Sequence, residues 1–236
     1  MARYYFIWNG VNSSNMGILM RAPVPIIKPE ERIEHVTVPG RSGELTVTEG
    51  EDIYQSYIQT VHIAVHQKSQ VHAVETWLRG DGYVTFSTQA DRRQIARVIG
   101  AVTLERKSRN LDWWEGDVQF YCNPLKETLV DEPDMEIDES GGDAFENPGD
   151  VVAKPLIQIR GSGLITVTCG GKTLTIDNCV DKWYIDSDAE WVTDKNGVPQ
   201  EGVCSGDFPV FAKGMNTVLY TGNISKLIIR SRWRFL

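Results

Sequence analysis

Ser42 is the residue whose local setting comes nearest to that of a catalytic nucleophile. It lies in the stretch VPGRSGE (38–44), directly after an alternating run that predicts a strand. The nucleophile elbow of hydrolases needs G-x-S-x-G, because both glycines let a strained turn expose the serine hydroxyl. Gly40 fits, but position 44 is glutamate and Gly43 comes one residue early. We therefore expect a turn shaped by Pro39 and the glycines, with no catalytic residue in it.

Two histidines have a spacing that could suit a shared metal ion. His62 and His66 are four residues apart, a spacing that would suit one metal ion on a helix. Their segment, YIQTVHIAVH (57–66), alternates apolar and polar residues and therefore predicts a strand. A strand rises ~3.3 Å per residue, so the two rings would lie roughly 13 Å apart, too far to share a metal. The sequence predicts no metal site.

No cofactor motif is complete. The stretch GSGLIT (161–166) begins like the dinucleotide fingerprint G-x-G-x-x-G, but Thr166 replaces its last glycine. The four cysteines contain no C-x-x-C pair, so neither a zinc ribbon nor a redox dithiol is supported: Cys122, Cys169, Cys179 and Cys204. We expect isolated buried thiols and no cofactor.

Two groups of aromatic residues are candidates for binding surfaces. Trp183, Tyr184 and Trp191 lie close together in the C-terminal part, where they would either stack on sugar rings or fill a core. No pair of carboxylates can be placed around them, so a glycosidase cannot be argued. Trp113 and Trp114 are adjacent, and adjacent residues on a strand face opposite sides. One of these two should point away from the core, which suggests an interface.

The elements that would position these residues are mostly strands. Short alternating runs predict strands at 4–8, 31–38, 57–66 and 113–122, among others. One segment changes to helical spacing, with Ser69 placed to cap its start and Gly80 to end it. Beyond residue 150, a Gly170-Gly171 hairpin turn and an Asn196-Gly197 turn separate further short strands. This pattern predicts a β-sandwich.

The segment 126–150 between these two parts is rich in aspartate and glutamate and poor in apolar residues. Such composition predicts a linker or an exposed excursion. A calcium loop is the alternative, but DMEIDESGGD (134–143) lacks the full pattern of oxygen ligands and glycine.

Composition limits the function classes. A chain of 236 residues is long enough for two domains, each with its own core. The 24 lysines and arginines oppose 32 aspartates and glutamates, giving a net charge of −8, which opposes binding to a phosphate backbone. The N-terminal MARYYFIWNG lacks the features of a signal peptide, and no run approaches the ~20 apolar residues of a membrane helix. We expect a protein made in a reducing cytoplasm, without membrane insertion.

Several stretches together, in their order along the chain, resemble one family. They are YFIWNGVNSSNMGILM, VPGRSGEL, FYCNPLKE, NPGDVVAKPLIQIRGSGLITVTCGGKTLTI, WYIDSD, GDFPVFAKGMNTV and KLIIRSRWRFL. The sequence is similar to the distal tail (Dit) proteins of long-tailed phages and their prophages, over nearly its whole length. The acidic segment shows least of this pattern.

This resemblance implies a mainly β protein with an N-terminal ring-forming domain (1–125) that contains one helix. After the acidic linker or excursion (126–150) that composition predicts, the resemblance implies a C-terminal β-sandwich (151–236) like that of galectins or carbohydrate-binding modules. The family is a structural hub of the virion tail tip or baseplate, not an enzyme. Its homohexameric ring joins the tail tube protein to the tail-associated protein, often anchors receptor-binding proteins for host adhesion, and lets DNA pass without specific binding.

On the hub interpretation Arg41 is the turn residue that reaches a neighbouring subunit or an acidic partner, and Trp113 and Trp114 are further interface candidates. The residues leave a second class open. In it, the C-terminal domain binds host cell-wall saccharide through Trp183, Tyr184 or Trp191. A hydrolase is the third class and has the least support, because the elbow pattern at Ser42 fails.

Overall fold

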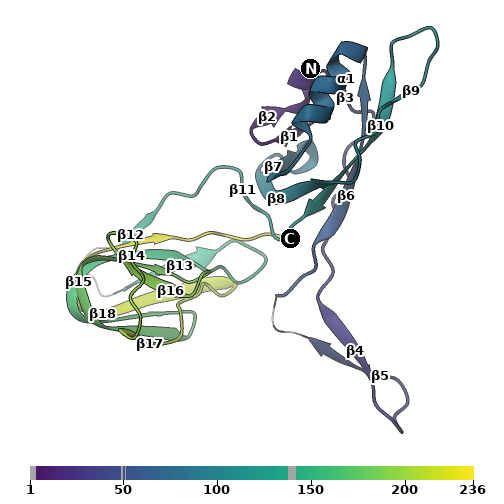
Figure 1. Ribbon diagram of the computed structural model, residues 1–236. Helices are drawn as coiled ribbons and strands as arrows, with labels where there is room; N and C mark the ends of the chain where they lie inside the picture. Colours follow the sequence, from purple (N-terminus) through teal and green to yellow (C-terminus); the bar gives the residue numbers. More distant parts are fainter. Residues whose placement is uncertain (1–3, 49, 51, 138–141) are drawn as a thin grey trace. The chain divides into compact units, whose positions relative to one another are not determined.

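The computed structural model describes residues 4–48, 50, 52–137 and 142–236. The chain divides into two compact units, Met1–Leu129 and Val130–Phe235, and each has its own hydrophobic core. The described residues are mainly strand with one α-helix, which lies in the N-terminal unit (Figure 1). The mainly β class predicted from the sequence is therefore confirmed.

The N-terminal unit is built on an antiparallel sheet that has nine strands within the described residues. Its order is β2 (Val11–Asn12), β1 (Phe6–Trp8), β7 (Asp81–Phe86), β8 (Arg92–Ile99), β10 (Trp114–Cys122), β6 (Tyr57–Val65) and β3 (Ile18–Leu19). Two short strands pair with this sheet outside that order: β11 (Glu127–Thr128) pairs with β8, and β9 (Glu105–Arg106) pairs with β10. The unit also contains two 3-10 turns, Ser13–Met16 and Ser87–Gln89, the helix α1 (Lys68–Trp77), and a separate two-stranded sheet of β4 (Ile33–Thr37) and β5 (Glu44–Thr48).

The core of this unit follows the alternation of its strands. Val61, Ile63 and Val65 of β6 are buried on one face, as the period-two pattern predicts. Helix α1 packs against this core through the buried Val74 and through Trp77, whose ring stacks on Phe6 at a centroid distance of 5.7 Å. The helix thus holds its place by burying an apolar stripe.

The start of α1 differs from its sequence-based prediction. Ser69 is the second residue of the helix, not its N-cap, and Gln67 at the cap position makes no side-chain capping bond. Instead the Lys68 N–H donates to Asp112 Oδ2 at 2.8 Å. This bond, and after it one from the Trp114 indole, holds the pKa of Asp112 below its ordinary value. A carboxylate 44 residues away in sequence satisfies the helix terminus, which no local pattern could indicate.

A polar network crosses the core of the N-terminal unit. The Tyr57 hydroxyl donates to Gln94 Oε1 at 3.0 Å, and Gln94 Nε2 donates to Cys122 Sγ at 3.2 Å. Burial raises the pKa of Tyr57 to about 12 and that of the Cys122 thiol to about 12. Both groups are therefore held neutral inside the protein.

This network makes the N-terminal unit sensitive to alkali. In the unfolded chain the thiol and phenol lose their protons near their ordinary pKa values of 9.0 and 10.0, which lie below the folded values. Stability is therefore fully present below pH ~9 and falls as pH rises toward ~12, because the unfolded state binds fewer protons there. Urea denaturation at several pH values should show this decline, and Tyr57→Phe should remove the part above pH ~10. A midpoint that is constant from pH 8 to 11 would contradict it.

The C-terminal unit is one antiparallel sheet with seven strands among the described residues. Its order is β12 (Met135–Ile137), β18 (Gly214–Arg230), β14 (Leu156–Cys169), β15 (Lys172–Asp186) and β16 (Trp191–Asp194). In addition, β13 (Gly142–Asn147) pairs with β18, and β17 (Cys204–Gly206) pairs with β15. Figure 1 shows the sheet curling over its own core.

The sequence predicts a sandwich of two layers. In the structure the same long strands bend and contribute to both layers. Register shifts interrupt the pairing of β14 at Gly163/Ile165, and bulges of this kind bend a strand. Ile159 and Ile165, on either side of the shift, face the same core. The predicted turn at Gly170-Gly171 is confirmed, with φ values of +58° and +74° that a two-residue primed turn requires.

The acidic segment, for which composition predicts a linker or an exposed excursion, contains paired strands. Within residues 126–150 lie the strands β11, β12 and β13. They form because β18 and β8 have free edges that accept backbone hydrogen bonds, and because Ile137 and Phe145 contact the C-terminal core. The need of backbone N–H and C=O groups for hydrogen-bond partners thus outweighs the tendency of the charged side chains to keep the segment in water. The part of the segment at 138–141 lies outside the described residues.

Candidate interaction surfaces

The stretch around Ser42 forms the tip of a β-hairpin. Strands β4 (Ile33–Thr37) and β5 (Glu44–Thr48) pair only with each other, as Figure 1 shows. At the tip the Arg41 N–H donates to the Val38 carbonyl at 3.1 Å, and Gly40 and Gly43 have φ values of +80° and +83°. The predicted turn is confirmed, and it exposes both Arg41 and Ser42.

This hairpin has one apolar face and one polar face. Val36 lies opposite Leu45, and Val47 lies opposite Glu34, so these valines and the leucine share a face. The pairs His35–Thr46 and Thr37–Glu44 lie on the other face. All residues from 30 to 48 are exposed, and Leu45 is 41% exposed. Alternation of this kind normally marks a strand pair with one face covered by protein.

Nothing within the described part of the chain covers the apolar face. A two-stranded hairpin is marginally stable by itself in water. At its base the Arg32 N–H donates to the Ile53 carbonyl at 2.9 Å, and the Gln55 N–H donates to the Glu30 carbonyl at 2.7 Å. We call Ile33–Thr48 the hairpin arm. It is a regular, hydrogen-bonded hairpin whose apolar side chains are exposed to water.

Trp113 and Trp114 point to opposite sides of the sheet, as adjacent residues on a strand should. Trp114 packs against the N-terminal core, and its indole donates to Asp112 Oδ1 at 2.8 Å. Trp113 lies on the other side, beside Arg21 at 5.8 Å and in edge contact with His66 at 6.0 Å. Both indoles are half-buried.

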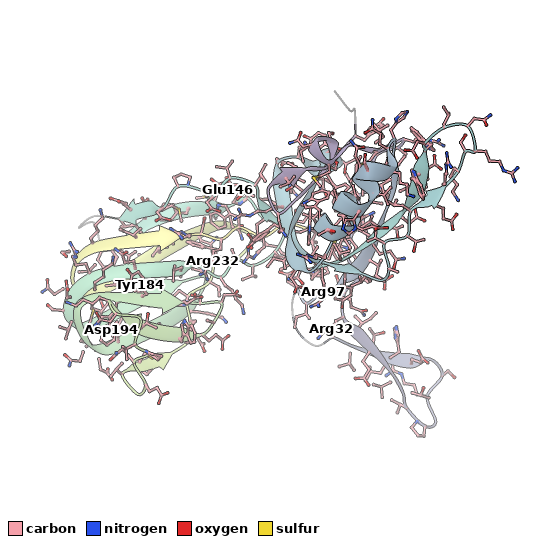
Figure 2. All side chains as sticks on the ribbon, turned by 45° about the horizontal axis from the view of Figure 1, so that its top comes forward. Arg32, Arg97, Glu146, Tyr184, Asp194 and Arg232 are labelled. Atoms are coloured by element: carbon pink, nitrogen blue, oxygen red, sulfur yellow. The ribbon has the colours of Figure 1, made fainter. Side chains whose placement is uncertain are left out.

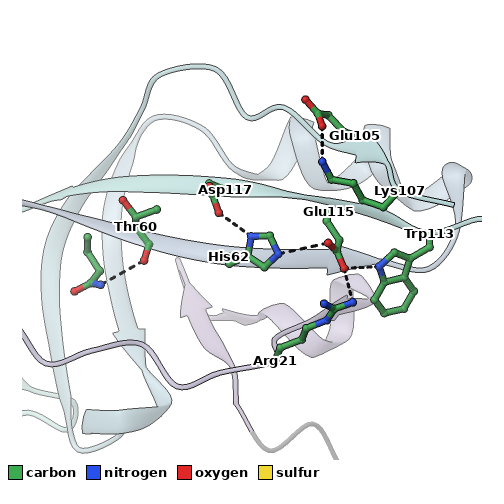
Figure 3. A network of polar contacts seen from close by, with 9 residues as sticks. Arg21, Thr60, His62, Glu105, Lys107, Trp113, Glu115 and Asp117 are labelled. Carbon is green, nitrogen blue, oxygen red and sulfur yellow. Dashed lines mark hydrogen bonds and ion pairs between the residues drawn. The ribbon is translucent and has the colours of Figure 1, made fainter.

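Glu115 is the centre of the polar network shown in Figure 3. Its Oε1 accepts a bond from the Trp113 indole at 2.6 Å and lies 2.6 Å from Arg21 Nη2. The Trp113 bond, and after it the Arg21 charge, lowers the pKa of Glu115 from its ordinary value. The network therefore fastens the segment that contains Arg21 to β10. This network could not be predicted from the sequence, because Arg21 and Glu115 are far apart along the chain.

His62 joins this network and does not ligate a metal with His66. Its Nδ1 lies 2.8 Å from Asp117 Oδ1, and its Nε2 lies 3.8 Å from Glu115 Oε2. Among the described residues no group of three or more His, Cys, Asp or Glu side chains could hold a metal ion.

A cleft of about 440 Å³ lies beside the network. Its polar lining includes His62, Glu105, Lys107, Glu115, Asp117 and Gln119. The charged groups are already paired, since Lys107 Nζ lies 2.5 Å from Glu105 and His62 is bonded to Asp117. The cleft therefore carries no clear signal for a ligand.

The aromatic group of the C-terminal unit is divided between core and surface. Trp183 is 5% exposed and belongs to the core cluster, so it cannot stack on a sugar ring. The prediction that Trp183 stacks on sugar is therefore wrong, because on β15 Trp183 faces the core while the residues next to it face outward. Tyr184 lies on the outer face, half-buried, and Trp191 is 54% exposed.

A bidentate ion pair holds the C-terminal end of the chain to β15. Arg232 donates to the two carboxylate oxygens of Asp186 at 2.7 and 3.0 Å. These bonds are the main cause of a lowered pKa at Asp186. Such forks fix geometry as well as charge. The pair spans 46 residues of sequence, so no local motif could have predicted it.

A comparison with solved structures finds a fold that matches this chain. One similar structure is that of the SPP1 Dit (gp 19.1) protein, described as a paradigm of the hub adsorption apparatus in phages that infect Gram-positive bacteria. The structural alignment covers 99% of each chain, with a TM-score of 0.74 and 15% sequence identity. The chain has the fold of SPP1 Dit.

Two comparisons of the sequence with known proteins do not find this likeness. The sequence matches no protein-family profile, and no curated protein is significantly similar to it. At this level of identity, what SPP1 Dit and the present chain share is the arrangement of backbone elements. Within the described ranges, no helix is long and apolar enough to cross a membrane.

Proposed function

We propose that this chain is a distal tail protein, the hub of a phage tail tip or baseplate. In this role six copies form a ring between the tail tube protein and the tail-associated protein, and receptor-binding proteins dock at its periphery. The protein is then a virion component with a structural role and no catalysis. The observation that carries the proposal is the fold match to SPP1 Dit over 99% of both chains.

The hairpin arm supports self-assembly. Its apolar face, formed by Val36, Leu45 and Val47, is exposed in the single chain. A neighbouring copy would cover this face, and the same contact repeated by rotation would close a ring. Exposed strand edges that would otherwise invite aggregation are then used for specific pairing. Arg41 at the tip of the arm, and the half-buried Trp113 and Trp114, remain candidates for contact with neighbours.

The net charge of −8 supports the passage of DNA. Phosphate groups are repelled by a negative lumen, so DNA would pass through the ring without binding. Electrophoretic mobility of duplex DNA should accordingly stay unchanged in the presence of the protein at physiological salt.

Light scattering of the purified full chain over a wide concentration range tests the ring. A ring has six times the 26.5 kDa mass of one chain, and negative-stain images of that species should show a central hole. A mass of one chain at every concentration would contradict a ring that assembles by itself. Dimers without higher species would contradict it too, because rotation about a head-to-tail contact cannot close at two.

Two adjacent substitutions at the tip of the arm separate the roles of charge and turn. Arg41→Glu should weaken ring assembly, because it reverses the charge offered to a neighbour or an acidic partner. Ser42→Ala should leave assembly nearly intact, because the serine shapes a turn and performs no chemistry. The dissociation of the ring on dilution gives the comparison. Equal tolerance of both changes would rule out Arg41 as an interface residue.

A further inference from the structure

The outer face of the C-terminal sheet carries a row of three basic residues. Arg160 of β14 lies directly opposite Lys182 of β15 and directly opposite Lys226 of β18. Like charges opposed across strands destabilise a sheet. Within the described part of the chain no carboxylate forms an ion pair with Arg160 or Lys182. Opposed like charges, two of which have no carboxylate partner, are typical of a functional surface.

Among the paired carboxylates of the same face, only Glu136 offsets a member of this row, Lys226. Asp134 is paired with Arg230 at 3.0 Å, Glu136 with Lys226 at 2.7 Å, and Asp186 with Arg232 at 2.7 Å. Arg160 and Lys182 are therefore the positive charges in excess on this face, in a chain whose net charge is −8. Charge complementarity favours an anionic ligand.

Two aromatic side chains continue the surface beyond the basic row. Tyr184 follows Lys182 by two residues on β15 and so shares its face, with Lys182 Nζ 5.0 Å from the ring centroid. Trp191 on β16 lies opposite Asp186, one step further along the same face. Tyr184 and Trp191 are thus diagonal neighbours, roughly 7–8 Å apart. Figure 2 labels Tyr184 and Arg232, which mark this face of the C-terminal unit.

Polar groups fill the space between the aromatics and the basic row. Gln158 of β14 and Thr193 of β16 both lie opposite Tyr184, one on each side of it. An amide and a hydroxyl each offer both a donor and an acceptor, which is what sugar hydroxyls require. Lys182 and Asp186 mark the two ends of the surface along β15, about 13 Å apart at ~3.3 Å per residue.

We propose that this outer face binds an acidic saccharide chain. Sugar rings lie against Tyr184 and Trp191, and carboxylate or phosphate groups of the chain lie on Arg160 and Lys182. Aromatic rings supply flat apolar area with little loss of entropy, while the cations select for charge. An acidic peptide satisfies the cations but leaves the aromatic surface without sugar rings, so the saccharide is favoured. The proposal does not depend on the hub role.

Calorimetric titration of the full chain tests this with four probes. They are a hexamer of galacturonate, a phosphorylated maltohexaose, neutral maltohexaose, and hexaglutamate. At least one acidic saccharide should bind about tenfold more tightly than the neutral sugar and the peptide, since bonds to charged groups contribute enough for that ratio. The two acidic saccharides distinguish carboxylate from phosphate. Equal binding of maltohexaose or hexaglutamate, or no binding of either acidic saccharide at about 1 mM, would overturn the proposal.

Variants locate the binding to this face. Arg160→Glu and Trp191→Ala should each weaken binding of the acidic saccharide by about tenfold or more. Both side chains are exposed, so each variant should keep the melting temperature of the parent. Lys172→Glu is the matched control, because Lys172 is an exposed cation at the opposite end of β15 and should leave binding unchanged. If Lys172→Glu weakened binding as much as Arg160→Glu, the binding would be general charge attraction and the proposed face would be refuted.

Discussion

Leu45→Asp is expected to abolish ring assembly and leave a folded single chain. Leu45 lies at the centre of the apolar face of the hairpin arm, opposite Val36 and two residues from Val47. In the proposed ring a neighbour would cover this face, so the substitution would bury a carboxylate without a partner at every interface. A buried unpaired charge costs several kcal/mol at each contact, about enough to break a ring whose closure needs all of them.

The folded state should tolerate this change, because Leu45 is 41% exposed in the single chain and lies outside both core clusters. Light scattering should report the mass of one chain, and the far-ultraviolet circular dichroism and melting temperature should match those of the parent. This prediction rests on the proposed ring. The mass of the parent protein tests whether the ring forms, and the mass of Leu45→Asp tests whether the hairpin arm makes the contact between subunits.

Thr46→Asp is the matched control for this experiment. Thr46 is adjacent to Leu45 and bears the same type of change, but it faces the other way, beside His35. An aspartate there should leave the ring largely intact. The assignment of the apolar face would be wrong if Thr46→Asp dispersed the ring as completely as Leu45→Asp, or if neither did.

Phe120→Ala is expected to destabilise the N-terminal unit by about 3–5 kcal/mol, a large part of the stability of a typical domain. Phe120 is fully buried on β10. Its ring contacts those of Phe6, Trp8 and Phe86 at centroid distances of 5.5, 5.4 and 5.9 Å. Truncation removes all three ring contacts and leaves a cavity that a sheet of fixed register cannot close.

Tyr121→Ala provides the comparison on the next residue of the same strand. Tyr121 is 47% exposed and points to the other side of the sheet, so its loss should change stability by about 0.5 kcal/mol or less. Denaturation in urea, followed by a signal for each unit, should show an earlier transition for the N-terminal unit of Phe120→Ala alone. The C-terminal transition should not move, because its core is separate. Similar shifts for both variants would mean that β10 is not oriented as described.

Features set by short-range patterns could be predicted from the sequence. The alternation of Val61, Ile63 and Val65 predicted a strand with one buried face, and that is its conformation. The turns at Gly40–Gly43 and Gly170-Gly171 followed from the need for positive φ, which glycine meets at no steric cost. The absence of a complete elbow at Ser42 argued for a turn, and the turn is present at the tip of the arm.

Features that depend on partners distant in sequence could not be predicted. The acidic composition of 126–150 predicted a linker or an exposed excursion, but it could not predict that three strands of this segment pair with β18 and β8. Ser69 was a good local candidate for capping α1, yet the Asp112 carboxylate accepts the hydrogen bond of the helix terminus, from the Lys68 N–H. In each case a backbone group found a better partner after the chain had folded than any partner its neighbours in sequence could supply.

The sequence by itself determined that this protein is mainly β, where its principal turns lie, and that it carries net negative charge. Only the tertiary structure decided that Trp183 is in the core while Trp191 is exposed, and that Arg160, Lys182 and Lys226 form one row. The reason is the geometry of sheets. Alternation along one strand tells which residues share a face, whereas the register between strands and the bulges that bend them set which face is buried and which side chains meet.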